Sequence, residues 1–227
     1  VAWGYAKEAA KRGVEIHQMT AVEDLVISEG RITAVKTNRG VIGCGCAVQA
    51  VAGHSSLLAQ KAGFRLPVVS YPLQAMVTQP VKPFLDPLVS SSALHCYVQQ
   101  TSRGEVVFGG GSDPYPLYNT RSTLDLKESL IAHGIEMFPF LAKARLIRQW
   151  AGITAMTPDY SPIMGESPVK NYYLDAGWAT WGFQATPVCG KTMADMAAGG
   201  GQTPQPIVSC QLERFHSYGT QRPCGYV

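Results

Sequence analysis

The chain has 227 residues, of which 46% are hydrophobic and 15% charged, and its formal net charge is +3. This composition is typical of a globular protein with a sizeable core and excludes a disordered chain. Lys and Arg are scattered rather than gathered in a stripe, which argues against a nucleic-acid partner. No apolar run reaches the roughly 20 residues of a membrane-spanning helix, so none is expected.

The first residues predict a helix followed by a strand. Residues 2–12 have helical composition, and Gly13 is a natural helix stop. Residues 14–19 predict a short strand. Val1 lies at the very start of the predicted helix and is not a methionine, so we expect the sequence to be the later part of a longer chain.

A small antiparallel meander is predicted next. The β-rich runs 25–28 and 32–37 flank a turn at 29–31, and a second turn follows at 38–40. The apolar run 46–53 predicts a buried strand.

A second helix follows, and after it the composition changes to one typical of strands. Residues 54–62 predict a helix that ends at Gly63. Three runs rich in aromatic and β-branched residues then predict strands, at 69–81, 95–100 and 104–111.

Residues 123–138 predict a helix that Thr123 or Ser122 caps and Pro139 ends. Its apolar stripe consists of Leu124, Ile131 and Ile135. With a further strand at 145–157, the block 67–158 predicts a sheet with helices on one face, which could form the floor and lid of a substrate pocket.

The last part of the chain predicts a strand over 171–178 and a helix over 184–198 with Pro187 in its first turn. Residues 199–206 are rich in glycine and proline and predict a flexible segment that ends this helix. The tail from Ile207 carries one short helix-like run.

Six cysteines lack the spacing of a metal site or redox motif. Cys44 and Cys46 would share one face of a strand. The pattern favours small buried residues in a reduced, cytoplasmic compartment over a disulfide or metal ligation.

The segment 175–190 carries the strongest functional pattern. A strand ends, Gly177 and Gly182 allow a tight turn, and a helix begins. Unpaired N–H groups at such a helix start can hold an anionic or electron-rich ligand edge, such as a reduced flavin. The alternative is an ordinary strand-to-helix turn.

The motif GW-x-T-x-GF-x-ATP at 177–187 resembles the C-terminal flavin motif of D-amino-acid-oxidase-like FAD-dependent oxidoreductases, in the form found in sarcosine oxidase beta subunits. Further segments resemble the family in the same order, from residue 1 to about 198. They include AGHSS at 52–56, GEVVFGGGSDPY at 104–115, RLIRQWAGI at 145–153 and TPDYSPIMGESPV at 157–169.

The resemblance implies an α/β (α+β) fold: the later part of a two-dinucleotide-type FAD-binding domain with an inserted mixed β-sheet substrate domain. Residues 1–66 would be the rear of the FAD domain, 67–158 the substrate domain and 159–206 the return to the FAD domain, with a tail at 207–227. The glycine loop for the FAD pyrophosphate would lie upstream of Val1.

The resemblance also implies a reaction: oxidation of a secondary or N-methylated amine such as sarcosine by hydride transfer to flavin, with oxygen as acceptor. FAD is the implied cofactor. Some family members also carry FMN, whose attachment histidine would precede Val1, and assemble with partner subunits as heterotetramers.

Site residues carry over by position. Val22 matches a residue whose backbone meets the adenine of FAD, although a simple core Val would explain it as well. Ala52, Gly53 and His54 match the strand-end motif near FAD, with Ala52 where the family usually has Gly. The second flavin motif is matched by Gly177, Trp178, Thr180, Gly182, Phe183 and Thr186.

Two departures bear on the substrate. Gln184 stands where the family usually places a lysine for the substrate carboxylate, and it offers hydrogen bonds without charge. Trp181 replaces a small residue beside the flavin and could narrow the pocket.

Other candidates have plainer explanations. His54, His95 and His133 are isolated and favour structural or exposed roles. The glycine-rich run 109–113 could face the pocket or form a turn. Lys191 is two helical turns beyond Gln184, too far to replace the lost charge. Asp159 and Glu166 lack the spacing of a glycosidase pair.

Two functions of different class remain. The first is part of an FAD-dependent amine oxidoreductase. The second is a non-catalytic subunit or binding module that keeps the fold and has lost the chemistry, which Gln184 and Trp181 weakly favour. A chain that lacked the preceding half altogether would instead be a structural half with an exposed sheet edge.

Overall fold

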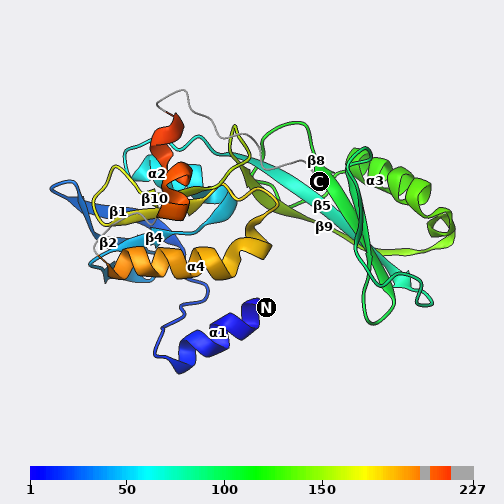
Figure 1. Cartoon of the computed structure of the whole chain (residues 1–227), viewed down its shortest axis with the longest axis horizontal. Coiled ribbons are helices and arrows are strands. Elements are labelled where there is room, and N and C mark those ends of the chain that lie inside the picture. The colour runs from blue at the N-terminus through cyan, green and yellow to red at the C-terminus, as the bar shows by residue number, and fades with distance from the viewer. Residues whose placement is uncertain (200–204, 216–227) are drawn as a thin grey trace.

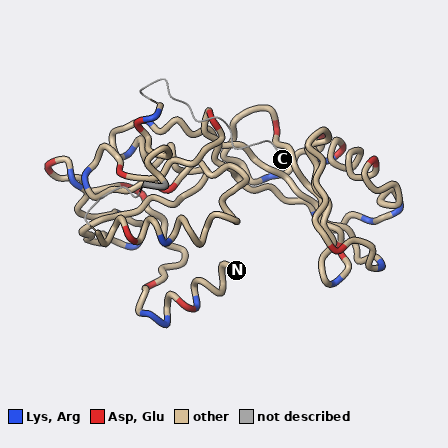
Figure 2. Tube along the Cα trace, viewed as in Figure 1, with Lys and Arg blue, Asp and Glu red and all other residues tan. Residues whose placement is uncertain are grey.

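The computed structural model describes residues 1–199 and 205–215. Two lobes are joined by a pair of long strands, which run from the centre of the molecule to its far end (Figure 1). Charged side chains are spread over both lobes, and the described residues show no basic stripe (Figure 2).

The first helix forms as predicted, but the strand expected after it does not. α1 (Ala2–Lys11) stands apart from the rest of the molecule, has no buried residue and is followed by Gly13 at φ 86° (Figure 1). The strand prediction for 14–19 is wrong, because no segment of the described chain pairs with these residues. Val14 and Ile16 are therefore about half exposed, at 54% and 50%.

The meander forms as predicted. β1 (Val22–Ser28), β2 (Arg31–Thr37) and β3 (Gly40–Gly43) make an antiparallel sheet in that order. Both residues of the first turn, Glu29 and Gly30, have positive φ, the conformation whose twist suits a tight hairpin.

A second sheet has the order β10-β11-β4. β4 (Ala47–Gln49) runs parallel to β11 (Tyr172–Ala176), and β10 (Ile163–Glu166) runs antiparallel to β11. The buried strand predicted over 46–53 is too long, because the chain turns at Ala52 (φ 44°) into the short helix η1 (Ala52–His54). β10 was not predicted, since its four residues lie in a proline- and serine-rich stretch.

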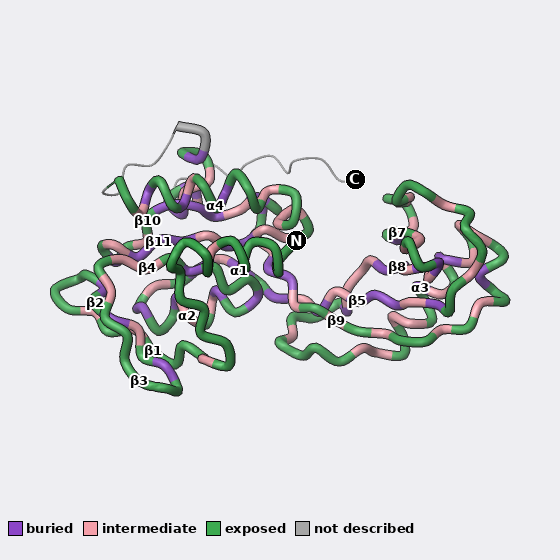
Figure 3. Tube along the Cα trace, turned by 90° about the horizontal axis from the view of Figure 1, so that it is seen from below, coloured by how far each residue is buried: buried purple, intermediate pink, exposed green. Residues whose placement is uncertain are grey.

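Helices cover both faces of this second sheet. Leu174 packs toward α2 (Ser55–Lys61) and η4 (Leu212–Phe215), while the neighbouring Tyr173 packs toward α4 (Gly182–Ala198) and η3 (Gln205–Cys210). Successive strand residues point to opposite faces, so both sides of β11 are buried. Figure 3 shows these buried positions along the strands between α4 and α2.

The other lobe is an antiparallel sheet of five strands, with α3 (Leu124–Met137) and η2 (Pro139–Lys143) on one face. Its order is β6 (Val89–Ser91), β7 (Cys96–Gln100), β8 (Glu105–Ser112), β5 (Val69–Pro80) and β9 (Leu146–Met156). The mixed α/β fold class is thus confirmed, whereas the domain boundaries stay a prediction.

The apolar stripe of α3 is only partly as predicted. Ile131 and Ile135 pack against the core, but Leu124 is 64% exposed, and Leu130 and Gly134 are the buried residues. Thr123 is the N-cap residue but makes no side-chain cap bond, because its hydroxyl donates to Asp113 instead.

Among the described residues, no helix is long and apolar enough to cross a membrane. The flexible stop predicted over 199–206 falls mostly on residues 200–204, outside the described part of the chain.

Candidate functional site

A cavity of about 1110 Å³ lies between the start of α4 and the five-stranded sheet. Its first wall, hereafter the turn wall, is formed by the carboxyl ends of the parallel strands β4 and β11 and by the residues that follow them. Its second wall, the sheet wall, comes from β5, β7, β8 and β9. A crevice at the carboxyl ends of parallel strands is the usual ligand site of open α/β sheets.

The turn wall is shaped by a glycine that no other residue can replace without strain. Gly177 has φ 71°, and a Cβ on it would lie 2.5 Å from Cγ2 of Thr157. Thr157 cannot easily move, since its hydroxyl donates to the carbonyl of Ser161 at 2.8 Å. The chain is therefore held in one path as it leaves β11.

Two backbone groups tie this turn to β9. The N–H of Ala179 donates to the carbonyl of Ala155 at 2.9 Å, and the Ala179 carbonyl accepts from the Thr154 hydroxyl at 3.0 Å. Ala179 itself has φ 46°. The turn wall and the sheet wall thus meet through the main chain of Ala179.

α4 begins at Gly182, two residues earlier than predicted, so Pro187 falls in its second turn rather than its first. Trp181 is the N-cap residue and supplies no side-chain cap bond. The first N–H groups of a helix have no partner within it and carry partial positive charge. Gly182 and Gln184 present this end of the helix to the cavity.

Asp175 places a carboxyl group on the turn wall, and it was not predicted as a site residue. Its Oδ1 accepts a hydrogen bond from Nε1 of Trp178 at 2.5 Å. Burial raises the pKa of Asp175, while the bond from Trp178 acts in the opposite direction. Burial, helped by the charge of Asp175, also raises the pKa of Cys189 to about 11, so this thiol stays protonated at neutral pH.

The residues that follow β4, 52–54, lie at the edge of the cavity, where Ala52 lines it and Gly53 is buried. Ala52 lines the cavity in the left-handed region that favours glycine (φ 44°), and its carbonyl accepts from the Ser55 hydroxyl at 2.6 Å. Gly53 is buried, and a Cβ on it would lie 2.1 Å from Cγ2 of Ile153. The close approach at Gly53 is therefore made by β9 of the same chain.

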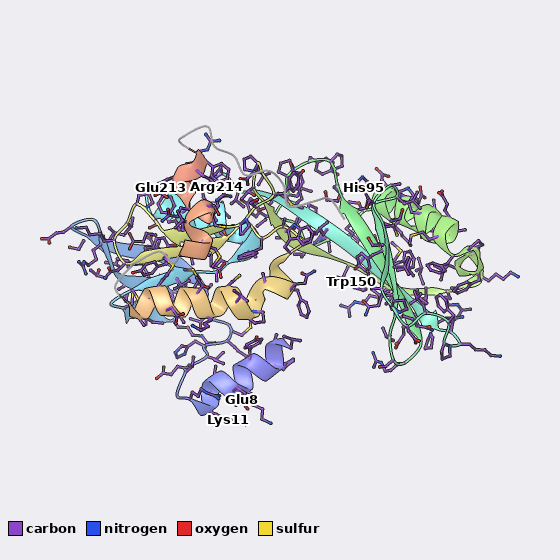
Figure 4. All side chains as sticks on the ribbon, viewed as in Figure 1. Glu8, Lys11, His95, Trp150, Glu213 and Arg214 are labelled. Carbon is purple, nitrogen blue, oxygen red and sulfur yellow. The ribbon has the colours of Figure 1, made fainter. Side chains whose placement is uncertain are left out.

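The sheet wall presents side chains. Tyr97 lies on β7 between Cys96 and Val98, which point into the opposite core, and burial raises the pKa of its hydroxyl. Trp150 of β9 lines the same cavity and is 38% exposed. His95, which precedes β7, completes this wall (Figure 4).

The glycine-rich run 109–113 is not a turn, because its first four residues belong to β8. Gly110 and Gly111 line the cavity, and a Cβ on Gly110 would lie 2.1 Å from the carbonyl oxygen of His95. Close packing against the backbone explains this glycine.

The cavity fits a flat ring system. Gly152 of β9 and Gly190 of α4 both line it, and a Cβ on either would meet no atom within 4 Å. A planar ligand can therefore approach the main chain at both places. The partial positive charge at the start of α4 suits an electron-rich ring edge, so the residues present fit a flavin.

Most of the predicted site residues come together here. Those on the cavity wall are Ala52, Gly177, Trp178, Thr180, Gly182 and Gln184, with Trp181 and Thr186 beside them. Four are not on it: Gly53 is buried, His54 is exposed, Phe183 is 73% exposed and Val22 is 41% exposed on β1. Their individual roles stay predictions.

Sequence reasoning missed Asp175, Tyr97 and Trp150. Asp175 opens the segment that carried the strongest pattern, and the alternation of Cys96, Tyr97 and Val98 indicates which way Tyr97 points. Within the described residues, no cluster of three or more His, Cys, Asp or Glu could hold a metal ion, and the five described cysteines are free thiols.

A sheet covered by helices on both faces, a glycine turn into a helix and a ring-sized cavity at the ends of parallel strands are typical of a domain that binds a nucleotide cofactor. A protein-family model described as "FAD dependent oxidoreductase" matches residues 1–196. The chain belongs to this family of FAD-dependent oxidoreductases.

Among known proteins, the chain is similar to sarcosine oxidase beta subunits. Sarcosine oxidase subunit beta of Rhizobium meliloti (strain 1021) is 44% identical over 216 residues, which are 95% of this chain and 51% of that protein. The same subunit of Rhodobacter capsulatus is 42% identical over 200 residues, 88% of this chain and 48% of that protein. The chain thus spans about half the length of these relatives.

Among solved structures, L-proline dehydrogenase from P. horikoshii superposes with a TM-score of 0.88 at 29% identity. The match covers 96% of this chain and 59% of that one. The overall fold of the chain is therefore shared with that enzyme over nearly its whole length.

Proposed function

We propose that the complete protein oxidises a secondary or N-methylated amino acid, such as sarcosine, with FAD as cofactor and oxygen as final acceptor. One observation carries the proposal: a single cavity joins the glycine turn at the start of α4 to the aromatic sheet wall. The sarcosine oxidase beta subunits at 42% and 44% identity support the choice of substrate.

FAD bound there would accept the hydride from the carbon next to the substrate nitrogen. The residues of this chain would bind and orient. The start of α4 and the open backbone at Gly190 would hold one side of the ring. The open backbone at Gly152 on the sheet wall, with Tyr97 and Trp150, would cover the other side and exclude water. Gln184 would donate hydrogen bonds to the substrate.

We also propose that the protein assembles with other subunits. The similar proteins are named as subunits, so we propose that this chain works in a heteromeric complex and that such a complex carries FMN as a second flavin. A cytoplasmic location is part of the same proposal.

The test uses the complete protein. We expect a bound-flavin spectrum that bleaches when sarcosine, dimethylglycine or proline is added without oxygen. Gly152→Leu should lose flavin or substrate binding, because the new side chain fills the cavity without meeting protein atoms at its Cβ. Gly43→Leu, at an exposed strand glycine away from the cavity with equal free space, should behave as the parent.

Bound flavin that none of these amines reduces would refute the oxidase and leave the alternative, a flavoprotein-like subunit without the chemistry. Retention of both flavin and turnover in Gly152→Leu would place the site elsewhere.

A further inference from the structure

The cavity wall is nearly without charge. Of the described residues that line it, none is Lys or Arg, and Asp175 is the one Asp or Glu. The remaining polar groups are neutral hydrogen-bonding side chains and His95. Whatever binds here meets the carboxyl group of Asp175 and no lysine or arginine from this part of the chain.

Asp175 is held in place on this wall. Its carboxylate accepts from the Trp178 indole at 2.5 Å, and both residues line the cavity. A substrate carboxylate entering the same space would be repelled by Asp175, whereas a protonated amine would be attracted.

The other polar groups on the cavity wall are suited to a neutral partner. Gln184 can both donate and accept, and so can the hydroxyls of Ser90, Ser92 and Tyr97. An amide or ester needs this combination. A carboxylate needs donors alone, and charged donors bind it most strongly.

Two cations of the described chain lie on elements that line the cavity, but neither is part of its wall. Lys191 lies on α4 beyond Gln184, but its Nζ donates to Asp195 at 2.5 Å on the exposed side of the helix. Arg148 leaves β9 on the same face as Trp150, two residues before it, and is not part of the cavity wall.

From this charge pattern we infer that the site favours an N-methylated amino acid whose carboxyl group is masked as an amide or ester over the free acid. Gln184 and Asp175 are the residues that set this preference. The inference rests on the proposed amine oxidation and adds the substrate class to it.

The experiment compares N-methylglycine with its amide in the complete, flavin-loaded protein, by anaerobic stopped-flow reduction of the flavin. We expect the amide to reduce the flavin at least about tenfold more efficiently, the size of one lost charged hydrogen bond. Acetamide should likewise perturb the flavin spectrum at lower concentration than acetate, a comparison that needs no turnover.

Gln184→Lys should reverse the preference by about tenfold or more, because it supplies the missing cation. Asp175→Asn should improve use of the free acid while keeping an acceptor for Trp178. Lys191→Gln is the matched control on the same helix and should leave the ratio unchanged, since its side chain lies outside the cavity.

Reduction by neither compound would refute the proposed function, and the inference would fall with it. A tenfold preference for the free acid, unaltered in Gln184→Lys, would overturn the inference alone. Loss of free-acid turnover in Arg148→Met would also overturn it, because a cation would then be reaching the cavity.

Discussion

The two walls of the cavity are built by different means. The turn wall is mainly backbone: its shape comes from Gly177, Ala179 and the first turn of α4, which are fixed by main-chain conformation and by what lies beneath. The sheet wall is mainly side chain, with Tyr97 and Trp150 held by a regular ladder. Substitutions in the residues packed beneath the turn wall should therefore destabilise the protein most. Substitutions in the polar network next to the sheet wall should destabilise it less.

The largest expected effect lies under the turn wall. Arg214 and Asp159 form a buried ion pair at 2.9 Å, and Arg214 also donates to the Ser161 carbonyl that anchors Thr157. Arg214→Leu leaves a buried carboxylate without its cation, so we expect a loss of about 3–5 kcal/mol in unfolding free energy, measured by urea denaturation.

Asp159→Asn in the Arg214→Leu background should recover part of that loss, because the buried charge is gone. Lys191→Leu, which breaks an exposed pair of 2.5 Å, should cost less than about 1 kcal/mol. Equal effects at the two ion pairs would contradict the role of burial.

The next effect is at the turn itself. Gly177→Ala forces a side chain into positive φ and against Thr157, so we expect a loss of about 2–4 kcal/mol. Gly152→Ala, which meets no atom, is the control on the sheet wall and should change stability by less than about 1 kcal/mol. Thermal unfolding of both variants checks the contrast, and a well-tolerated Gly177→Ala would show that the turn can relax.

A smaller effect is expected behind the sheet wall. Buried Gln74 donates to Asp113 and Thr123 and accepts from the N–H of Thr123 and from Gln149. Gln74→Met leaves these partners unsatisfied and should cost about 1–3 kcal/mol in urea denaturation. Gln79→Met on the exposed end of β5 should fall within about 0.5 kcal/mol of the parent, and a similar loss at both positions would rule out the network as the cause.

The smallest effect depends on pH. Burial raises the pKa of Asp175, so its favourable contribution to folding is complete below the ordinary value of 3.8 and is lost as the pH rises through the raised pKa. Asn does not titrate. Asp175→Asn should therefore match the parent at the acid end and gain about 1 kcal/mol or less toward neutral pH, measured as unfolding free energy against pH. If Asp175→Asn instead became less stable than the parent as the pH rises, the folded protein would be stabilising the ionised form of Asp175.

Much of the fold could be predicted from local pattern. The meander, the strands of the large sheet and the helix after Gly177 all carry periodicity and turn residues that act over a few positions. Residues 14–19 have the composition of a strand, yet a strand also needs a partner, and sequence alone does not say whether one is present. β10 was missed for the converse reason, since β11 supplies what its own sequence lacks.

The candidate site was predictable where it depends on backbone and hidden where it depends on distant contacts. The glycines at 177 and 182 indicate a turn by themselves. The bond between Asp175 and Trp178 could have been suspected from their spacing, but Tyr97 and Trp150 join the site only through the pairing of strands far apart in the chain. Gly53 stays a predicted cofactor residue, but its close contact with Ile153 of β9 depends on the fold and could not be predicted from the sequence.

β5 and β9 pair over nearly their whole length and extend from one lobe to the other (Figure 1). Both strands are attached to the first lobe at Gly53. Ile153 of β9 packs against this glycine, and the Ser70 hydroxyl of β5 donates to its carbonyl. The position of the sheet wall relative to the turn wall therefore depends in part on contacts at Gly53, a residue that is not itself on the cavity wall.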